Sequence, residues 1–383
     1  MDTIDAHDTL RLDFQTSFGS LQDPGRVALY GCVRLTRQAS IRASWSGLIG
    51  RLARLLPPSL AGLPIEVRIP DGLGGWLSQS TQLTRDGRFY VRYQHLPDTL
   101  TTQDAHTHRI HAQVLAPCFD RTWIHRIAGL FSNEAYSTRQ SHSAIKKLVG
   151  EISVTLHSEH NPTPFVCSDL DHTLVETNIR DIVRGQYTWR PGMRDLCRDL
   201  AQHAVLSIVT SSPETMHPEI INTLRQNDII PSAGIHAQNW KKSPYHARLP
   251  GKLETIFSMA NEWPKQRQVI LIGDNTHSDP LIYRSVTEIF DGTRTPANIE
   301  QLCRIHGASL SQSIRIAALA EHAASRQHSV SLVLIIESSR RRNPGNYKHS
   351  WPKPSARFYY VSPALDGVAH MRTLLQACGA LPC

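Results

Sequence analysis

A short apolar stretch that ends in two carboxylates constrains the fold of this chain most strongly. Residues 164–168 read Pro-Phe-Val-Cys-Ser, and Asp169-Leu170-Asp171 follows directly. A run of this length after two prolines is typical of a buried strand rather than a helix. Ligands of open α/β sheets bind beyond the carboxyl ends of the strands, so we expect Asp169 and Asp171 to lie at a crevice.

Two carboxylates at this place are suited to phosphate chemistry. One carboxylate can attack phosphorus, and a second one two residues on can protonate the leaving group and then activate water. Their repulsion calls for a hard cation, and Mg²⁺, which binds carboxylates, waters and a substrate phosphate together, meets that need. The alternative is an Asp-rich turn that caps a strand, because such short matches also arise by chance.

Three further segments favour the phosphate chemistry over a simple turn. They are residues 204–213, a second buried strand that ends in hydroxyls; Lys252, at the start of a helical pattern; and residues 269–280, a third strand that ends in acids. Polar groups that recur at strand ends and a helix start indicate one shared site.

These segments follow the order found in the haloacid-dehalogenase-type phosphatases. Among these enzymes, the chain resembles a narrower family, the phosphatidate phosphatases of the actin-patch-protein type. The resemblance covers about residues 160–290, and it is carried by Ser168 to Thr173, Val209 to Pro213, Lys252-Leu253 and Gly273-Asp274 through Tyr283. The chain departs from the family pattern at His172, where a third Asp is usual, and at Glu214, where an aromatic residue is usual.

The resemblance implies a role for each polar residue of the site. Asp169 is the expected nucleophile, which forms an aspartyl-phosphate, and Asp171 is the expected general acid and base. Thr210 is expected to hydrogen-bond a phosphoryl oxygen, and Lys252 to offset negative charge. The expected Mg²⁺ ligands are the carboxylates of Asp169, Asp274 and Asp279 and the backbone carbonyl of Asp171.

Two of these assignments have alternatives. Lys241 or Lys242 can take the place of Lys252, although Lys252 opens a helical pattern and so has a defined direction. Ser211 or Ser212 can supply donors to the same phosphoryl oxygen.

The length of 383 residues predicts two or three domains. We expect an α/β fold in which residues 161–383 form a haloacid-dehalogenase-like Rossmannoid domain with a parallel sheet, a small cap or none, and an insertion near 291–328. A small β-sandwich, residues 1–99, is expected before it, with a helical and polar connecting region at 100–160. The lack of a large cap predicts an open site for bulky substrates.

The N-terminal expectation rests on strand patterns at 27–33 and 64–69 and on a hairpin signal at 84–93, where Asp86-Gly87 precedes alternating residues. Residues 41–56 form a basic amphipathic pattern, which either lies in an anionic membrane interface or packs on the sandwich.

The connecting region carries few signals of a site. His106, His108 and His111 lack the Cys or carboxylate partners of a metal site, so a solvated linker is the expectation, with a helix at 142–149.

Charge and cysteine usage bear on partners and location. The chain has 41 Lys and Arg against 33 Asp and Glu, a net charge of +8, which favours anionic partners such as lipid headgroups or nucleic acid. A basic loop at 338–353 either binds phosphates, stacks on bases or is solvated.

Seven Cys without a Cys-x-x-Cys pair and the lack of a signal-peptide pattern predict a cytoplasmic protein. No run of eighteen apolar residues predicts a span, so contact with a membrane is expected to be peripheral.

The sequence therefore predicts a Mg²⁺-dependent phosphatidate phosphatase. A protein or polynucleotide phosphatase is the alternative on the same fold, because Asp169 to Leu174 also resembles the polymerase-tail phosphatases, although their last acidic motif differs from residues 273–280. A non-catalytic membrane-binding scaffold is a third hypothesis, against which the complete set of polar site residues argues.

Overall fold

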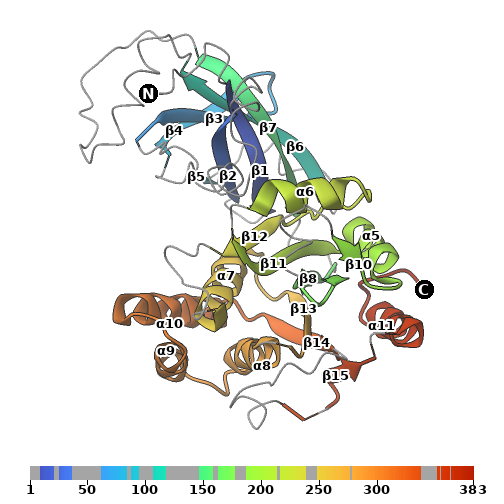
Figure 1. The fold of residues 1–383 in the computed structure, drawn as a ribbon. Coiled ribbons are helices and arrows are strands. Elements are labelled where there is room, and N and C mark those ends of the chain that lie inside the picture. Colours follow the sequence, from blue (N-terminus) through green and yellow to red (C-terminus); the bar gives the residue numbers. More distant parts are fainter. Residues whose placement is uncertain are drawn as a thin grey trace, which may run out of the picture. The chain divides into compact units, whose positions relative to one another are not determined.

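The computed structural model describes residues 9–20, 26–36, 62–83, 88–94, 107–117, 146–157, 163–176, 187–213, 216–238, 248–276, 278–337, 352–353, 355–362 and 364–383. The chain divides into two compact units, Met1–Leu156 and His157–Cys383. Figure 1 shows a β-rich first unit and a second unit in which helices flank a sheet. The stretch 41–56 and most of the basic loop at 338–353 lie outside the described residues.

The first unit is built on one seven-stranded sheet with the order β4-β3-β6-β7-β1-β2-β5. Its strands are β1 Thr9–Ser20, β2 Arg26–Thr36, β3 Pro64–Pro70, β4 Trp76–Gln82, β5 Arg88–Gln94, β6 Thr107–Pro117 and β7 Lys146–His157. The strand patterns at 27–33 and 64–69 are thus confirmed as β2 and β3.

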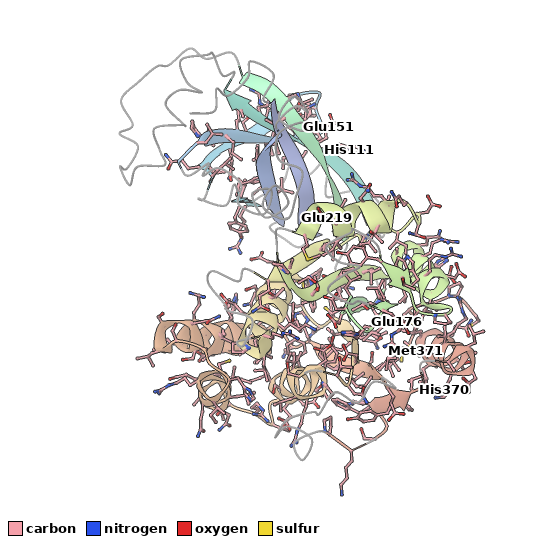
Figure 2. All side chains as sticks on the ribbon, viewed as in Figure 1. His111, Glu151, Glu176, Glu219, His370 and Met371 are labelled. Atoms are coloured by element: carbon pink, nitrogen blue, oxygen red, sulfur yellow. The ribbon has the colours of Figure 1, made fainter. Side chains whose placement is uncertain are left out.

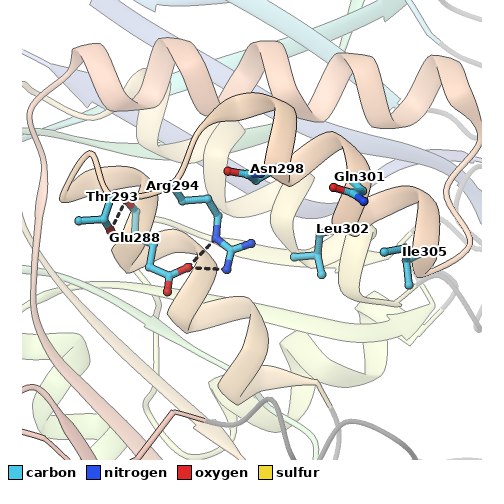
Figure 3. Close-up of a pocket in the computed structure, with 7 residues that line it drawn as sticks. All are labelled: Glu288, Thr293, Arg294, Asn298, Gln301, Leu302 and Ile305. Carbon is cyan, nitrogen blue, oxygen red and sulfur yellow. Dashed lines mark hydrogen bonds and ion pairs between the residues drawn. The ribbon is translucent and has the colours of Figure 1, made fainter.

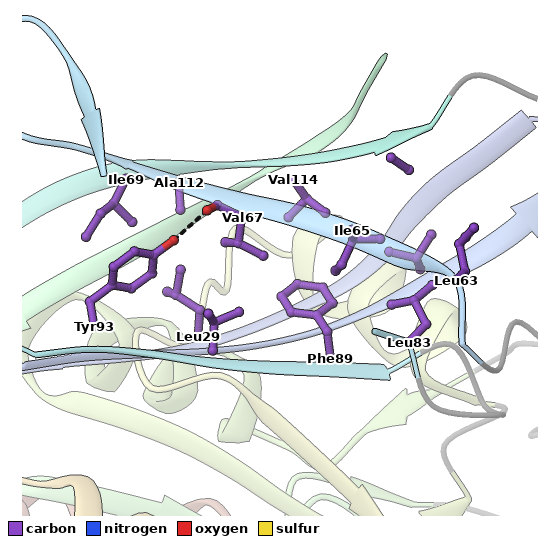
Figure 4. Packing of buried hydrophobic residues seen from close by; sticks show 13 residues of the cluster. Leu29, Leu63, Ile65, Val67, Ile69, Leu83, Phe89, Tyr93, Ala112 and Val114 are labelled. Atoms are coloured by element: carbon purple, nitrogen blue, oxygen red, sulfur yellow. Dashed lines mark hydrogen bonds between the residues drawn. The ribbon is translucent and has the colours of Figure 1, made fainter. Parts of the chain in front are cut away.

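The sheet curves until its two ends face each other. Apolar residues from β2, β3, β5 and β6 form one core, as Figure 4 shows. The hydroxyl of Tyr93 on β5 donates to the backbone carbonyl of Val67 on β3 at 2.6 Å, although these strands lie far apart in the sheet order. Alternating apolar residues on β3, Ile65, Val67 and Ile69, point into this core. One curved sheet therefore stands where the sequence predicted a small β-sandwich.

The hairpin predicted at residues 84–93 is wrong. β5 pairs with β2, and β4 pairs with β3. The β3–β4 connection has the stronger turn chemistry, because Asp71 Oδ1 accepts the N–H groups of Leu73 and Gly75 at 2.8 and 2.7 Å. β5 lies at the opposite end of the strand order from β4.

The helix predicted at 142–149 is wrong at residues 146–149, which begin β7, and residues 100–160 are not a helical connection where the structure describes them. β6 and β7 are strands of the first sheet. His111 on β6 and Glu151 on β7 are labelled in Figure 2, and Gln113 Nε2 donates to Glu151 Oε1 at 3.3 Å. The alternation of Ile110, Ala112 and Val114 in β6 is the strand signal that the histidine-rich composition obscured.

The second unit holds a six-stranded sheet with the order β12-β11-β8-β13-β14-β15, in which every pair is parallel. Its strands are β8 Phe165–Ser168, β11 Val205–Pro213, β12 Ile235–Gln238, β13 Gln268–Asp274, β14 Ser329–Ile336 and β15 Phe358–Val361. A two-stranded sheet, β9 Val175–Glu176 and β10 Thr188–Trp189, follows β8. The predicted α/β fold with a parallel sheet is confirmed.

Helices cover both faces of this sheet (Figure 1). α5 and α11 lie on one face, and α7 and α8 lie on the other, with α10 packed outside them. The helices are α5 Met193–His203, α6 His217–Arg225, α7 Arg248–Glu262, α8 Asp279–Phe290, α9 Pro296–Ile305, α10 Leu310–Ser325 and α11 Leu365–Ala377. The segment predicted as an insertion near 291–328 forms α9 and α10. Among the helices that the structure describes, none combines the length and apolar character needed to cross a membrane.

The strand order places the chemistry. Counting only the strands of the six-stranded sheet, β8 is the first and β13 the fourth, and the order reverses between them, which is where ligands bind in doubly wound sheets. Asp169 follows β8 and Asp274 ends β13. The two acids therefore emerge side by side at the carboxyl edge of the sheet.

His328 is expected to make the second unit sensitive to acid. It is buried, its Nδ1 accepts the backbone N–H of Arg267 at 3.3 Å, and its Nε2 lies 2.8 Å from the carbonyl of Ala260, so the ring is neutral with its proton on Nε2. Burial lowers the pKa of His328 to about 4, whereas the unfolded chain takes up this proton near pH 6.5. Stability is therefore full above pH 6.5 and falls towards pH 4, by up to about 3 kcal/mol.

Urea unfolding between pH 7 and pH 4 measures this loss. His328→Gln is expected to be less stable than the wild type at pH 7 but to lose less stability on acidification. An unchanged slope in the variant would contradict the assignment.

Candidate active site

Three buried carboxylates meet at the carboxyl edge of the second sheet. Asp169, Asp274 and Asp279 are 3%, 0% and 1% exposed, and one oxygen of each lies within 4.8 Å of the others. They come from the loop after β8, the end of β13 and the first turn of α8. The structure thus brings together three residues that the sequence singled out from segments a hundred residues apart.

Local hydrogen bonds fix two of these acids. The backbone N–H of Asp169 donates to the carbonyl of Ile272 at 2.8 Å, which ties the loop after β8 to β13. Thr173 Oγ1 lies 3.4 Å from Asp169 Oδ2, and both the backbone N–H and the hydroxyl of Thr276 donate to Asp274 Oδ1. The carboxylates of Asp169 and Asp274 are therefore held by hydrogen bonds from threonines two to four residues further along the chain.

Lys252 lies between two of the acids. Its Nζ is 2.9 Å from Asp169 Oδ1 and donates to Asp279 Oδ1 at 2.7 Å. Burial alone would lower the pKa of this amine, but Asp169 and Asp279 raise it above its ordinary value, so Lys252 is charged at neutral pH. Lys252 lies in the second turn of α7. The alternatives Lys241 and Lys242 lie outside the described residues.

Asp171 faces a pair of hydroxyls. Thr210 Oγ1 and Ser212 Oγ both donate to Asp171 Oδ2 at 2.7 Å, and the backbone N–H of Ser212 donates to Thr210 Oγ1 at 3.0 Å. His172 has a φ of 61°, which turns the chain sharply after Asp171. Thr210 thus orients Asp171 in this structure, and Ser212, an alternative donor in the sequence, takes part.

Gly273 allows Asp279 to approach Asp169 and Asp274; these three carboxylates are here called the acid cluster. A Cβ at this position would lie 2.6 Å from Asp279 Oδ2 and 2.7 Å from Tyr283 Cε2. Tyr283 in turn donates its hydroxyl to the carbonyl of Ile272 at 2.9 Å. The segment from Asp279 to Tyr283 can therefore pack against β13 only because residue 273 has no side chain.

The acid cluster fits a hard cation. Burial raises the pKa of Asp169 well above its usual range, Lys252 lowers it, and Asp279, Asp274 and Asp171 raise it again. Asp169, Asp274 and Asp279 are thus buried together around Lys252, and carboxylate oxygens are the donors that Mg²⁺ prefers. A cation would relieve the repulsion among these carboxylates.

The site also contains two arginines, Arg248 and Arg190, which the sequence analysis missed. Arg248 begins α7, one helical turn before Lys252; burial lowers its pKa to about 10, and Asp171 and Asp169 raise it, so it stays charged. The spacing of four residues is a signal that could have found it. Arg190, which follows β10, is 6% exposed, and Asp274 is among the acids that raise its pKa against burial. No motif marks Arg190.

A separate hollow of about 500 Å³ lies in the α8–α9 region (Figure 3). It is lined by Glu288, Thr293, Arg294, Asn298, Gln301, Leu302 and Ile305. Glu288 forms ion pairs with Arg284 and with Arg294. The hollow contains none of the acids at the carboxyl edge, and its charges satisfy each other.

Comparison with solved structures gives only distant similarity. The chain aligns with a calcium-binding mutant of Bacteroides uniformis β-glucuronidase 2 at 11% identity and a TM-score of 0.26, covering 90% of this chain and 34% of that one. It aligns with a GH2 β-galacturonidase from Eisenbergiella tayi at 9% identity and a TM-score of 0.28, covering 96% and 54%. The chain therefore spans about a third to a half of these proteins, and scores of this size do not define a shared fold. Comparison with curated proteins gave no match.

A family model does match the part of the chain that carries the site. Residues 165–297 match the model described as phosphatidate phosphatase APP1, catalytic domain. The match begins at β8 and ends in α9, so it contains all the acids, Thr210 and Lys252. About a third of the chain, the part that carries the site, is therefore similar to the catalytic domain of a phosphatidate phosphatase.

Proposed function

We propose that this protein is a Mg²⁺-dependent phosphatase of the haloacid-dehalogenase type, which hydrolyses phosphatidate to diacylglycerol and phosphate through an aspartyl-phosphate on Asp169. The observation that carries the proposal is the buried group of Asp169, Asp274 and Asp279 around Lys252. Such a group is unfavourable in a protein that only binds a surface, because each buried carboxylate costs solvation free energy.

Asp169 and Asp274 are the first proposed Mg²⁺ ligands, with the backbone carbonyl of Asp171. Bound Mg²⁺ neutralises the phosphoryl oxygens and helps to align the attacking and leaving groups. Asp279 was also an expected ligand, and its Oδ1 accepts from Lys252 while its Oδ2 lies 3.5 Å from the backbone N of Asp274. We therefore assign to Asp279 the additional role of positioning Lys252.

The first chemical step uses Asp169 and Asp171. An Asp169 oxygen forms a bond to phosphorus, the bond from phosphorus to the glycerol oxygen breaks, and Asp171 gives its proton to that oxygen. Lys252, 2.9 Å from Asp169, stabilises the charge that collects on the phosphoryl group. Diacylglycerol leaves as a neutral alcohol.

The second step reverses the roles of the two acids. Asp171 takes a proton from water, the water oxygen bonds to phosphorus, and the bond between phosphorus and Asp169 breaks. Thr210 and Ser212 hold Asp171 in one orientation for both proton transfers. The Thr210 hydroxyl has one proton, so it can serve a phosphoryl oxygen only after it turns away from Asp171.

Mg²⁺ is expected to stabilise the folded protein. At a concentration about 100 times its dissociation constant, the ion adds about 2.7 kcal/mol and raises the melting temperature by about 5 °C or more. Asp274→Asn is expected to lose most of this shift, because it removes a carboxylate that is 0% exposed and central to the acid cluster. The exposed Asp228→Asn is the matched control, since Asp228 has a φ of 58° that asparagine also tolerates.

Differential scanning fluorimetry with Mg²⁺ and with chelator makes this measurement without a substrate. An equal shift in the wild type and in Asp274→Asn would place the cation elsewhere.

A further inference from the structure

Exposed apolar side chains are concentrated at one edge of the second unit. Among its described residues, five large apolar side chains are more than half exposed: Ile230, Ile305, Leu310, Ile314 and Leu365. Four of them lie at the carboxyl edge of the sheet, where the acid cluster lies, as the connections of the fold show.

The start of α10 lies beside the catalytic part of α7. Gln312 Nε2 and Arg315 Nη2 contact the carboxylate of Glu254 at 3.2 and 2.7 Å, and Glu254 is two residues from Lys252. Asn261, near the other end of α7, bonds the carbonyl of Leu319. α10 therefore runs parallel to α7 and begins at the carboxyl edge, which places Leu310 and Ile314 there on one helical face.

Ile305 lies at the same edge of the sheet as Leu310. α8 runs from the carboxyl edge to the amino edge after β13, and β14 must start at the amino edge. α9 therefore runs towards the carboxyl edge, and α10 runs back towards the amino edge. The turn between them is tight, since the backbone N–H of Ala308 donates to the carbonyl of Cys303 at 2.9 Å. Ile305 and Leu310 flank this turn.

Leu365 reaches the carboxyl edge from another element. It begins α11 shortly after β15 ends. A Cβ at Gly192 would lie 3.4 Å from Leu365 Cδ2, and Gly192 follows Arg190 by two residues. Ile305, Leu310, Ile314 and Leu365 are here called the apolar rim. Ile230, by contrast, leads into the amino end of β12, at the opposite edge.

We propose that the apolar rim docks on the surface of a lipid bilayer that contains anionic lipid. Between Glu300 and Glu321 the chain carries no carboxylate, and Arg304 precedes Ile305 directly, which suits a negative surface. The proposal rests on the proposed function, because phosphatidate stays in the bilayer and must be reached by an edge that faces it. Exposed apolar side chains at that edge can enter the headgroup region, as interfacial helices do.

Vesicle sedimentation tests the apolar rim with the full-length protein. The vesicles contain phosphatidylcholine with or without phosphatidate, and Mg²⁺ is replaced by chelator so that lipid is not consumed. Leu310→Gln/Ile314→Gln is expected to weaken binding to phosphatidate-containing vesicles at least about tenfold, and Leu365→Gln to weaken it less. The matched control is Ile230→Gln, an equally exposed residue at the amino edge, which should bind as the wild type does.

The outcomes separate the docking surface from the chemistry. Hydrolysis of a soluble aryl phosphate should be unchanged in the rim variants, which shows that they fold. Equal vesicle binding by the double variant and the control, or no binding by the wild type, would overturn the apolar rim. Binding without hydrolysis of phosphatidate in Mg²⁺ would overturn the proposed substrate and leave the rim standing.

A second inference comes from an independent observation, the buried guanidinium of Arg190. Its backbone N–H donates to the carbonyl of Leu174 at 3.0 Å, but its Nε is buried without a hydrogen-bond partner, and within the described part of the chain its side chain forms no ion pair. Tyr187 Oη and Trp189 Nε1 are also buried without partners. A buried donor that lacks an acceptor is costly, so the Arg190 guanidinium indicates a missing ligand rich in acceptors.

We infer that Arg190 binds the phosphate group of the substrate. Arg190 is suited to this task because a guanidinium can give two parallel hydrogen bonds to a phosphate. Glu176 and Asp274 are the acidic groups that act on it, and neither forms an ion pair with it. This inference deepens the proposed function by naming the residue that recognises the phosphate.

Isothermal titration of inorganic phosphate into the Mg²⁺-loaded protein tests Arg190 without turnover. Arg190→Met is expected to weaken binding at least about tenfold, Arg190→Lys to weaken it less, and the exposed Arg194→Met not at all. If Arg190→Met does not fold, the lysine variant decides, since it keeps the charge but not the two-pronged geometry. Unchanged binding in the variants contradicts the role of Arg190 alone, whereas a wild type that binds no phosphate contradicts the proposed function as well.

Discussion

Replacing Asp169 with asparagine is expected to lower the rate of phosphate release by at least about 10⁴-fold, because an amide oxygen cannot form the covalent bond to phosphorus. Asn has nearly the same shape, and Asp169 is 3% exposed, so the change removes a charge without leaving a cavity. Removing this charge also lowers the repulsion within the acid cluster, where Asp274 and Asp279 remain. The variant should therefore fold at least as well as the wild type and yet be inactive.

Hydrolysis of a soluble aryl phosphate measures this effect apart from membrane binding. Asp228→Asn, the same change at an exposed position, should keep the wild-type rate. Borohydride reduction during turnover is expected to convert Asp169 to homoserine, which mass spectrometry detects, because an acyl phosphate is reduced and a free carboxylate is not. Homoserine at Asp171 instead of Asp169 would exchange the two proposed roles.

Lys252→Met is expected to have the largest effect on stability. Lys252 lies 2.9 Å from Asp169 and 2.7 Å from Asp279, and all three side chains are buried. Removal of the ammonium leaves two uncompensated buried carboxylates, which costs about 3–5 kcal/mol of the free energy of unfolding. The pKa of Lys252 is raised in the folded state, so its contribution is full below pH 10 and is lost only as pH rises through that raised value.

A double-mutant cycle separates the charge from the packing. Lys252→Met combined with Asp279→Asn should be less destabilised than the sum of the two single variants, because each change relieves the charge that the other exposes. Urea unfolding at pH 7 in chelator gives all four free energies, and the exposed Lys265→Met is the control. Strict additivity in this cycle would show that the ion pair does not form.

The sequence predicted the acid cluster because its signals are local. Buried apolar runs that end in acids appear at 164–171 and 269–274, and parallel strands bring such ends to one edge. The packed position of Lys252 followed from the helical pattern around it. The strand order then placed these residues together, as the fold class implied.

Other parts of the structure depend on contacts that a single sequence does not display. The hairpin signal at 84–93 was overridden by pairing of β5 with β2, which are distant in the chain. β6 and β7 were missed because polar and histidine-rich composition outweighed a short alternation. The bond from Thr210 to Asp171 spans 39 positions, and Arg190 has no partner that a motif could record.

Phosphate release from phosphatidate in mixed micelles, with Mg²⁺ and with chelator, tests the central claim most directly. The protein is compared on phosphatidate, on a phosphopeptide and on a 5′-phosphorylated oligonucleotide at equal concentration. The account predicts rapid, Mg²⁺-dependent release from phosphatidate and little from the other two substrates. Intact phosphatidate alongside Mg²⁺-dependent cleavage of the peptide or the oligonucleotide would contradict it.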